Sequence, residues 1–252
     1  MNSNSVSSSR SINNRLNIPS SRPLFKHLKH RALKAFAGLV IFTAILFGQA
    51  FADGQVSSLP DPIVDYSVAK NSTRQSAVFA GGCFWGVQAV FQHVKGVVSV
   101  TAGYAGGASK TAKYDLVSTG VTGHAESVEV VYDPEKVTYG QLLRIYFAVA
   151  HDPTQLNRQG PDTGTQYRSE IFAIDGKQKE IAEAYIRQLT AVKVFPEEIV
   201  TKVSMLPAFY PAEQYHQNFA NLHPENPYIV INDLPKLNHL KAQFPRLFNP
   251  VE

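Results

Sequence analysis

The single cysteine of the chain, Cys83, lies where a short apolar stretch gives way to a helical pattern, in the segment Gly81-Gly82-Cys83-Phe84-Trp85-Gly86. The two glycines allow a sharp turn, which places Cys83 at the first turn of the predicted helix. Free backbone N–H groups and the helix dipole favour an anion there, so the pKa of the thiol is expected to fall below its ordinary value of about 8.5. The segment therefore predicts a reactive cysteine; the alternative is a buried, inert cysteine that packs as a small apolar residue.

A cysteine can also be the nucleophile of a hydrolase or transferase if an imidazole lies beside it. Six histidines follow residue 52, among them His93, His124 and His151, the last of which precedes Asp152. We therefore keep a cysteine hydrolase or transferase with a Cys-His pair as the alternative to the enzyme class that the motifs described below indicate. The non-enzymatic alternative is a binding module for methionine-rich or aromatic surfaces, which would keep its activity after Cys83→Ser.

The composition is that of a globular protein, and the sequence contains no motif for a metal or a cofactor. The chain has 252 residues, of which 44% are hydrophobic and 17% are charged, which argues against a disordered or coiled-coil protein. One cysteine cannot form an internal disulfide or a four-thiolate zinc site, and no His/Cys cluster has metal-ligand spacing. No glycine-rich phosphate loop is present. We expect no bound metal, flavin or nicotinamide.

The net charge of +4 is unevenly distributed. Residues 1–52 contain seven Lys and Arg and no acid, whereas residues 53–252 contain 17 Lys and Arg against 20 Asp and Glu, a net charge of −3. A nucleic-acid interface needs a basic stripe on the folded domain. We expect no nucleic-acid partner.

Residues 1–52 have the pattern of a targeting leader. A basic cluster precedes the uncharged apolar residues 35–48, and the segment closes with Gln49-Ala50-Phe51-Ala52. These are the parts of a secretory signal peptide, and they predict cleavage after Ala52 and export to the periplasm. The alternatives are an uncleaved membrane anchor, since residues 35–52 lack charge, and an organelle transit peptide.

We expect residues 53–75 to be a linker and residues 76–252 to be one monomeric domain. Apolar periodicity predicts strands over residues 76–80, 97–104, 127–132 and 167–174, and helices over residues 83–93, 138–150 and 177–192. This β-α-β-β-α-β order predicts an α+β fold (an α/β sandwich) with a split β-α-β, ferredoxin-like core. The last sixty residues are rich in Pro, Asn and aromatics and are expected to be a long irregular C-terminal segment with short helical pieces such as residues 212–222.

Several motifs, in order along residues 76–220, are together specific for one family. The chain resembles peptide methionine sulfoxide reductase A in the motifs GCFWG (82–86), GYAGG (103–107), TGHAE (122–126), YDP (132–134), HDP (151–153), RQGPDTGTQYRS (158–169) and FYPAEQYHQ (209–217).

The resemblance implies a role for each site residue. Cys83 corresponds to the nucleophile, Glu126 to the acid, and Tyr104, Asp162 and Tyr167 to their polar partners, while Phe84 and Trp85 correspond to the pocket for the S-methyl group of the substrate. The family reduces the S epimer of methionine sulfoxide, free or in proteins, and leaves a sulfenic acid on the cysteine. A carboxyl group in an apolar pocket has a raised pKa and can protonate the sulfoxide oxygen near neutral pH.

Many relatives form a disulfide between the oxidised cysteine and a resolving cysteine near the C-terminus, but no cysteine follows Cys83. The resemblance then implies an external thiol reductant, either thioredoxin or glutathione with a glutaredoxin.

Overall fold

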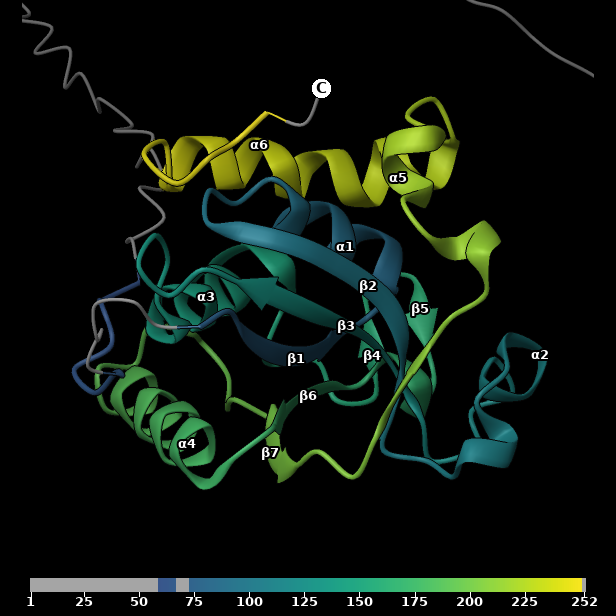
Figure 1. Cartoon of the computed structure of the whole chain (residues 1–252), viewed down its shortest axis with the longest axis horizontal. Coiled ribbons are helices and arrows are strands. Elements are labelled where there is room, and N and C mark those ends of the chain that lie inside the picture. Colours follow the sequence, from purple (N-terminus) through teal and green to yellow (C-terminus); the bar gives the residue numbers. More distant parts are fainter. Residues whose placement is uncertain (1–58, 67–72, 251–252) are drawn as a thin grey trace, which may run out of the picture. The chain divides into compact units, whose positions relative to one another are not determined.

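The computed structural model describes residues 59–66 and 73–250 (Figure 1). A mixed sheet forms its centre, with the strand order β7-β6-β1-β3-β2-β8. The strands are β1 (Gln75–Gly81), β2 (Val97–Ala105), β3 (Ala125–Tyr132), β6 (Ser169–Ala173), β7 (Lys202–Met205) and β8 (Phe209–Pro211). A separate small ladder joins β4 (Arg158–Gln159) and β5 (Asp162–Thr163).

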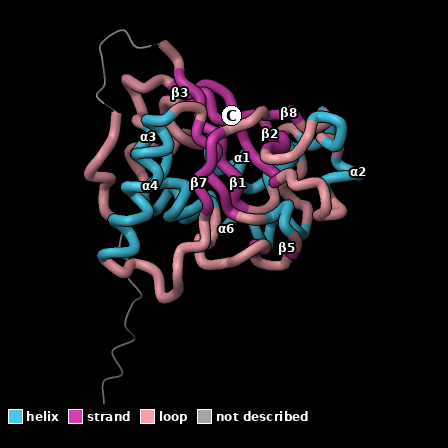
Figure 2. Tube along the Cα trace, turned by 90° about the horizontal axis from the view of Figure 1, so that it is seen from below, coloured by secondary structure: helices cyan, strands magenta, loops and turns pink. Residues whose placement is uncertain are grey.

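The four inner strands confirm the predicted ferredoxin-like core. β1 lies between β6 and β3, β3 pairs with β2, and all three pairings are antiparallel. Helix α1 (Phe84–Gln92) connects β1 to β2, whereas α3 (Tyr139–Ile145) follows β3 and α4 (Gly176–Ala191) follows β6. Figure 2 shows the strands gathered in the middle, with α3 and α4 beside one another to one side. This is the split β-α-β arrangement.

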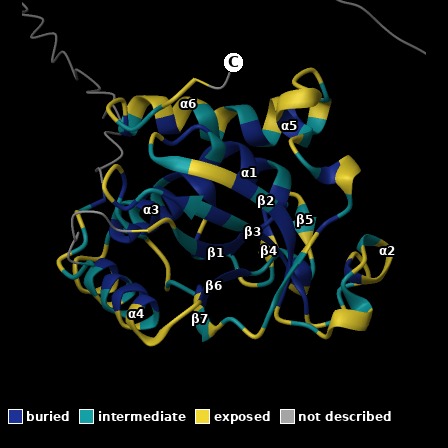
Figure 3. Ribbon diagram, in the orientation of Figure 1, coloured by how far each residue is buried: buried dark blue, intermediate teal, exposed yellow. Residues whose placement is uncertain are grey.

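Alternation along β1 explains why the sheet has two different faces. Ala77 and Phe79 belong to the main apolar core with α1 and α3, whereas Val78 and Ala80 belong to a smaller cluster on the opposite face. Seven of the nine residues of α1 are buried, and Figure 3 shows this helix in the interior beneath α6 (Leu234–Gln243). The core therefore fixes the N-terminus of α1 against the sheet.

The structure differs from the predicted elements at two positions near the core. The predicted helix over residues 138–150 begins after Thr138, whose capping box with Gln141 is formed, but its last turn is a π-helix, η2 (Tyr146–Ala150). The predicted strand over residues 167–174 was too long, because residues Thr165–Tyr167 form a 3₁₀ turn, η3, before β6 begins at Ser169. Gly164, with φ of 139°, and the buried Gln166, whose amide donates to the Ser118 carbonyl, hold that turn.

The C-terminal segment contains more regular structure than its sequence pattern predicted. It includes α5 (Phe219–Leu222), a π-helical turn η5 (Ile229–Asp233) and α6, which packs on α1. The remaining short helices are η1 (Ser109–Thr111), α2 (Tyr114–Val117) and η4 (Gln214–His216).

Residues 59–66, within the predicted linker, contact the domain. Asp65 accepts hydrogen bonds from the Gly140 backbone N–H (3.0 Å) and the Thr138 hydroxyl (2.5 Å), and so adds a cap to α3. Tyr66 donates to Asp175. The predicted leader, residues 1–52, lies outside the described residues. Within the described ranges, no helix is long and apolar enough to cross a membrane.

Candidate active site

Cys83 occupies the junction between β1 and α1. Strand β1 ends at Gly81, and Gly82 has φ of 91°, a conformation that glycine adopts without strain. A Cβ atom on Gly82 would also lie 2.6 Å from the Cβ of Gln159, so no other residue fits this turn. Cys83 is then the N-cap residue of α1 and remains partly exposed.

Glu126 lies beside the same helix N-terminus. Strand β3 places it opposite Tyr104 of β2, with only 2% of its surface exposed. Its Oε2 atom accepts a hydrogen bond of 3.0 Å from the Phe84 backbone N–H, the first amide of α1. Burial raises the pKa of Glu126 from 4.5 to about 8, and the charge of Asp162 adds to the rise, although the Phe84 amide opposes it. The carboxyl group is therefore mostly protonated at pH 7.

The thiol of Cys83 does not have the low pKa expected from its position in the sequence. Burial raises its pKa well above the ordinary value, and the nearby charge of Glu126 raises it further, while the Trp85 backbone N–H lowers it. Burial is the largest of these causes, and the Phe84 amide at the same helix N-terminus donates to Glu126. Two acidic groups share one helix N-terminus, so ionisation of either one disfavours ionisation of the other.

Tyr104 belongs to a second buried network at the site. Its hydroxyl donates to Oε2 of Glu213 (2.8 Å), and Oε1 of Glu213 accepts from the Tyr114 backbone N–H (3.0 Å). Burial and the charge of Glu213 raise the pKa of Tyr104, while these hydrogen bonds lower the pKa of Glu213. Glu213 is thus an ionised carboxylate that fixes the Tyr104 hydroxyl.

Asp162 and Tyr167 reach the site from the loop around β5 and η3. Asp162 accepts a hydrogen bond from the hydroxyl of Tyr228, and both residues line a cavity of about 80 Å³ that also includes Cys83. Burial raises the pKa of Tyr167, and the charges of Glu126, Asp162 and Cys83 contribute to the rise. The structure thus places Cys83 and Asp162 on one cavity and pairs Tyr104 with Glu126 across β2 and β3, while Tyr167 is close enough for the charges of Glu126, Asp162 and Cys83 to affect its pKa.

Aromatic rings form the apolar part of the site. Phe84, at 1% exposure, packs against Tyr104 with 5.9 Å between ring centroids. Trp85 stacks on Phe219 at 3.7 Å, and its indole N–H donates to Nδ1 of His216 (3.2 Å). These contacts hold the two side chains that follow Cys83 in fixed orientations.

A cysteine thiol, a neutral carboxyl group and an aromatic wall together suit the reduction of a sulfoxide, because the carboxyl group can protonate the sulfoxide oxygen. A sequence model of the peptide methionine sulfoxide reductase family matches residues 75–247, more than half of the chain. The chain belongs to this family. It is accordingly an oxidoreductase that reduces methionine sulfoxide and thereby repairs oxidised methionine.

Known relatives resemble this reductase over most of their own length. Peptide methionine sulfoxide reductase MsrA 2 from Mesorhizobium japonicum is 62% identical over 175 residues, which cover 69% of this chain and 90% of the relative. Its namesake from Synechocystis sp. is 53% identical over 188 residues, or 74% of this chain and 88% of the relative.

Solved structures show the same fold. Methionine sulfoxide reductase A of Corynebacterium diphtheriae matches with a TM-score of 0.54 and 36% identity, covering 66% of this chain and 84% of that chain. Mxr1 from Saccharomyces cerevisiae in its reduced form matches with a TM-score of 0.58 and 30% identity, covering 67% and 94%.

The alternative Cys-His pair has no support in the geometry of the reductase. His93 lies at the opposite end of α1 from Cys83 and bonds to the Ala89 carbonyl. Both ring nitrogens of His124 are engaged, by the Gly107 amide and the Ala108 carbonyl.

His151 is engaged in the same way. Its ring nitrogens contact the Tyr146 carbonyl and the Thr201 hydroxyl, and burial lowers its pKa to about 3. It is a neutral, structural imidazole beneath the turn that precedes Cys83, since a Cβ on Gly81 would lie 3.0 Å from His151.

Sequence reasoning gave no role to three side chains that hold the site: Glu213, His216 and Tyr228. Glu213 and His216 belong to the motif over residues 209–217, which could have indicated them. Tyr228 lies beyond the last motif, and its position depends on how η5 folds back over α1. No pattern in the sequence indicates that contact.

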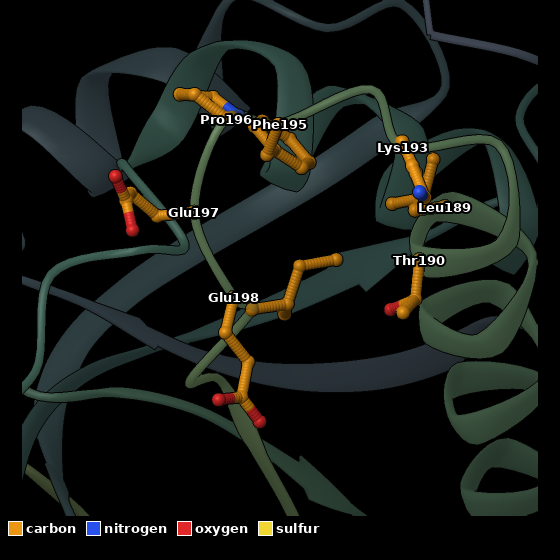
Figure 4. Close-up of a pocket in the computed structure, with 8 residues that line it drawn as sticks. Leu189, Thr190, Lys193, Phe195, Pro196, Glu197 and Glu198 are labelled. Carbon is orange, nitrogen blue, oxygen red and sulfur yellow. The ribbon is translucent and has the colours of Figure 1, made fainter.

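The groove in Figure 4 is a different feature of the reductase. Its volume is about 490 Å³, and it lies between the C-terminal end of α4 and residues 193–199. Glu197 and Glu198 are exposed and extend in different directions, and Lys193 is exposed as well. The groove therefore lacks a buried reactive group. Among residues 59–66 and 73–250, no cluster of three His, Cys, Asp or Glu could hold a metal ion.

Proposed function

We propose that Cys83 is the nucleophile and Glu126 the proton donor in the reduction of the S epimer of methionine sulfoxide, free or in proteins. The observation that supports this most directly is the buried carboxyl of Glu126 at the first turn of α1, with its pKa raised to about 8. A sulfoxide sulfur is a poor electrophile until its oxygen receives a proton or a strong hydrogen bond. A carboxyl that is neutral at pH 7 can supply that proton.

The proposed reaction transfers one oxygen atom. The Cys83 sulfur attacks the sulfoxide sulfur, and the sulfoxide oxygen takes the proton of Glu126 as negative charge develops on it. The thiol proton that Cys83 loses replaces it on Glu126, so the carboxyl group ends the step protonated. The S–O bond to the substrate breaks, methionine leaves, and the hydroxyl ends on Cys83 as a sulfenic acid. The substrate sulfur gains two electrons, and Cys83 loses two.

Tyr104 and Tyr167 hold the sulfoxide oxygen in this proposal, and Asp162 completes the polar side of the site. In the substrate-free protein the Tyr104 hydroxyl donates to Glu213, so it exchanges that acceptor for the substrate oxygen. Phe84 and Trp85 receive the S-methyl group, since their rings are packed in place by Tyr104 and Phe219. Hydroxyl donors placed this way stabilise the negative charge that develops on the oxygen, once Tyr104 has left its acceptor Glu213.

An external thiol restores the enzyme. The chain has no second cysteine, so the sulfenic acid on Cys83 cannot form an internal disulfide. A first thiol condenses with the sulfenic acid and releases water, and a second thiol then reduces the mixed disulfide. We propose thioredoxin as the source of these thiols, with glutathione and a glutaredoxin as the other source.

We also propose where the protein acts and in which oligomeric state. The basic cluster, the apolar residues 35–48 and the closing Ala50-Phe51-Ala52 support export with cleavage after Ala52, and a membrane anchor is the alternative. N-terminal sequencing of the fractionated protein distinguishes them: a mature chain that starts at Asp53 supports export, and an intact Met1 in the cytosol contradicts it. We propose that the enzyme acts as a monomer.

Turnover with each separate sulfoxide epimer tests the chemistry. With dithiothreitol, the wild-type protein is expected to consume methionine S-sulfoxide and to leave the R epimer untouched. Cys83→Ser is expected to lose essentially all turnover while its unfolding curve stays close to that of the wild type, because only one atom changes. Turnover that survives in Cys83→Ser would remove the proposed nucleophile.

A further inference from the structure

A buried ion pair, Asp233 with Lys236, lies against the first turn of α1 and has no role in the proposed reaction. Asp233 ends η5, and Lys236 lies one turn later in α6. The Lys236 Nζ atom lies 3.2 Å from Oδ1 of Asp233, and the side chains are 22% and 1% exposed. The second oxygen, Oδ2, is buried and has no hydrogen-bond partner among residues 59–66 and 73–250. A buried carboxylate with one unsatisfied oxygen lowers the stability of the folded protein, so the presence of Asp233 at this position calls for an explanation.

The pair lies close to Cys83. Gly86 is the third residue of α1, and a Cβ atom there would lie 1.9 Å from Oδ1 of Asp233 and 2.8 Å from Nζ of Lys236. Lys236 also lines the 80 Å³ cavity that includes Cys83. Figure 1 shows α6 lying next to α1. The distances at Gly86 place both charged groups beside the first turn of α1.

We propose that Asp233 and Lys236 set how readily Cys83 ionises, with the Lys236 ammonium favouring the thiolate and the Asp233 carboxylate opposing it. Both residues act on the reaction through Cys83. The inference rests on the proposed role of Cys83 as the nucleophile. The two charges affect the pKa of the thiol in these opposite directions, and Asp233 also holds the ammonium in place. Within a poorly solvated site, a single charge a few ångströms away changes an ionisation equilibrium substantially.

Other ionisable groups also face this region, from each element packed around it. They are Glu126 of β3, Asp162 of β5, His151 after η2, Tyr114 of α2, Tyr167 of η3 and Tyr228 before η5. They are present in every variant of the pair, and the titration of His151 and of Tyr228 is itself coupled to Lys236 and Asp233. The pair is therefore identified by opposite shifts of the Cys83 titration in two successive variants, not by a single change.

The test measures the pH dependence of Cys83 alkylation by iodoacetamide in the full-length protein. Cys83 is the single cysteine, so the label reports one site. Asp233→Asn keeps the shape and the acceptor for Lys236 but removes the negative charge. It is expected to lower the titration midpoint and to speed alkylation at a fixed pH below that midpoint by roughly three- to tenfold.

Adding Lys236→Met to Asp233→Asn removes the remaining charge and is expected to raise the midpoint again. The double variant is more informative than Lys236→Met alone, in which the unpaired carboxyl of Asp233 would itself take up a proton. Lys241→Met is the matched control, because this exposed lysine of α6 lies over Phe248, near the opposite end of α1. It should leave the midpoint unchanged.

Opposite shifts in the two steps support the proposal, whereas a loss of packing alone would not reverse sign. A midpoint that stays constant in Asp233→Asn, or that falls again in the double variant, overturns it. The alkylation assay does not depend on turnover. If Cys83→Ser still reduces sulfoxide, the proposed function fails separately from the role of the pair.

Discussion

Glu126 and Cys83 lie at the same helix N-terminus, where the Phe84 amide donates to the carboxyl group and the Trp85 amide lowers the pKa of the thiol. With the pKa of Glu126 at about 8, the group is a proton donor at neutral pH and a carboxylate in alkaline solution. The raised pKa of Cys83 means that thiol and carboxyl are both mostly protonated before substrate binds. In the proposed reaction, the sulfoxide oxygen is the group that takes a proton from this coupled pair.

The pH dependence of turnover follows from the protonation of Glu126. Since the reaction uses the protonated carboxyl, turnover limited by this step is expected to fall as the pH rises through about 8. Glu126→Gln keeps the shape but cannot donate a carboxyl proton, so its turnover should be about 10²- to 10⁴-fold lower and should lose that alkaline decline. A kcat–pH profile of both proteins checks this. Wild-type turnover in Glu126→Gln would show that another group is the donor.

The pH dependence of the free energy of unfolding provides a second test of Glu126→Gln. The folded-state pKa of Glu126 lies above its ordinary value of 4.5, so the folded protein binds the proton more tightly than the unfolded chain does. Its contribution to stability is complete below about pH 4.5 and is lost as the pH rises towards 8. Glu126→Gln should lack that loss, so its free energy of unfolding relative to the wild type should increase across this interval.

Among the secondary-structure elements, helix α1 connects the residues of the proposed reaction to the rest of the fold. Its first turn contacts Glu126 of β3 on one side and Asp233 of η5 on the other. Gly86 makes the second contact possible, because any side chain there would overlap the carboxylate.

Replacement of this glycine tests the packing between α1 and α6. Gly86→Ala is expected to reduce the free energy of unfolding by about 1–3 kcal/mol, because Asp233 and Lys236 must shift to make room. Gly176→Ala is the matched control: this residue also lies in the first turn of a helix, but a Cβ atom on it meets no atom of the described part of the chain within 4 Å. Denaturant unfolding should show the control equal to or more stable than the wild type. An equal loss in both variants would contradict a specific contact at Gly86.

Local patterns predicted the elements with strong periodicity and failed where distant residues decide the conformation. The strand before Gly81, the helix after Cys83 and the Thr138 cap could be read from neighbouring residues, since each depends on turn chemistry or on one apolar face. The 3₁₀ turn at Tyr167 depends on the contact of Gln166 with residue Ser118, far away in the sequence. The path of η5 and α6 over α1 likewise depends on long-range packing, so Tyr228, Asp233 and Lys236 were not predicted near Cys83.

At the scale of the whole molecule, one sulfur atom must serve the full catalytic cycle. The family motifs indicated Cys83, Glu126, Tyr104, Asp162 and Tyr167, and the fold places them together, although composition alone gave no reason to choose them. The network through Glu213 could be predicted only as a motif, because its partners Tyr104 and Tyr114 lie about a hundred residues earlier.

The fate of that sulfur is measurable by mass spectrometry of the intact protein. After one equivalent of methionine sulfoxide and no reductant, the chain is expected to gain one oxygen atom at Cys83. After addition of a small thiol, it should gain that thiol in disulfide linkage instead. A disulfide-linked dimer of two chains as the main product would contradict reduction by an external thiol.

The raised pKa of Cys83 has a consequence for survival of the enzyme under stress. Peroxides react with thiolates far faster than with thiols, and over-oxidation beyond the sulfenic acid is irreversible. A resting sulfur that keeps its proton offers such oxidants little to attack, while a bound sulfoxide meets both the sulfur and the acid it needs. The same conditions that damage methionine in other proteins would then leave this catalyst largely intact between turnovers.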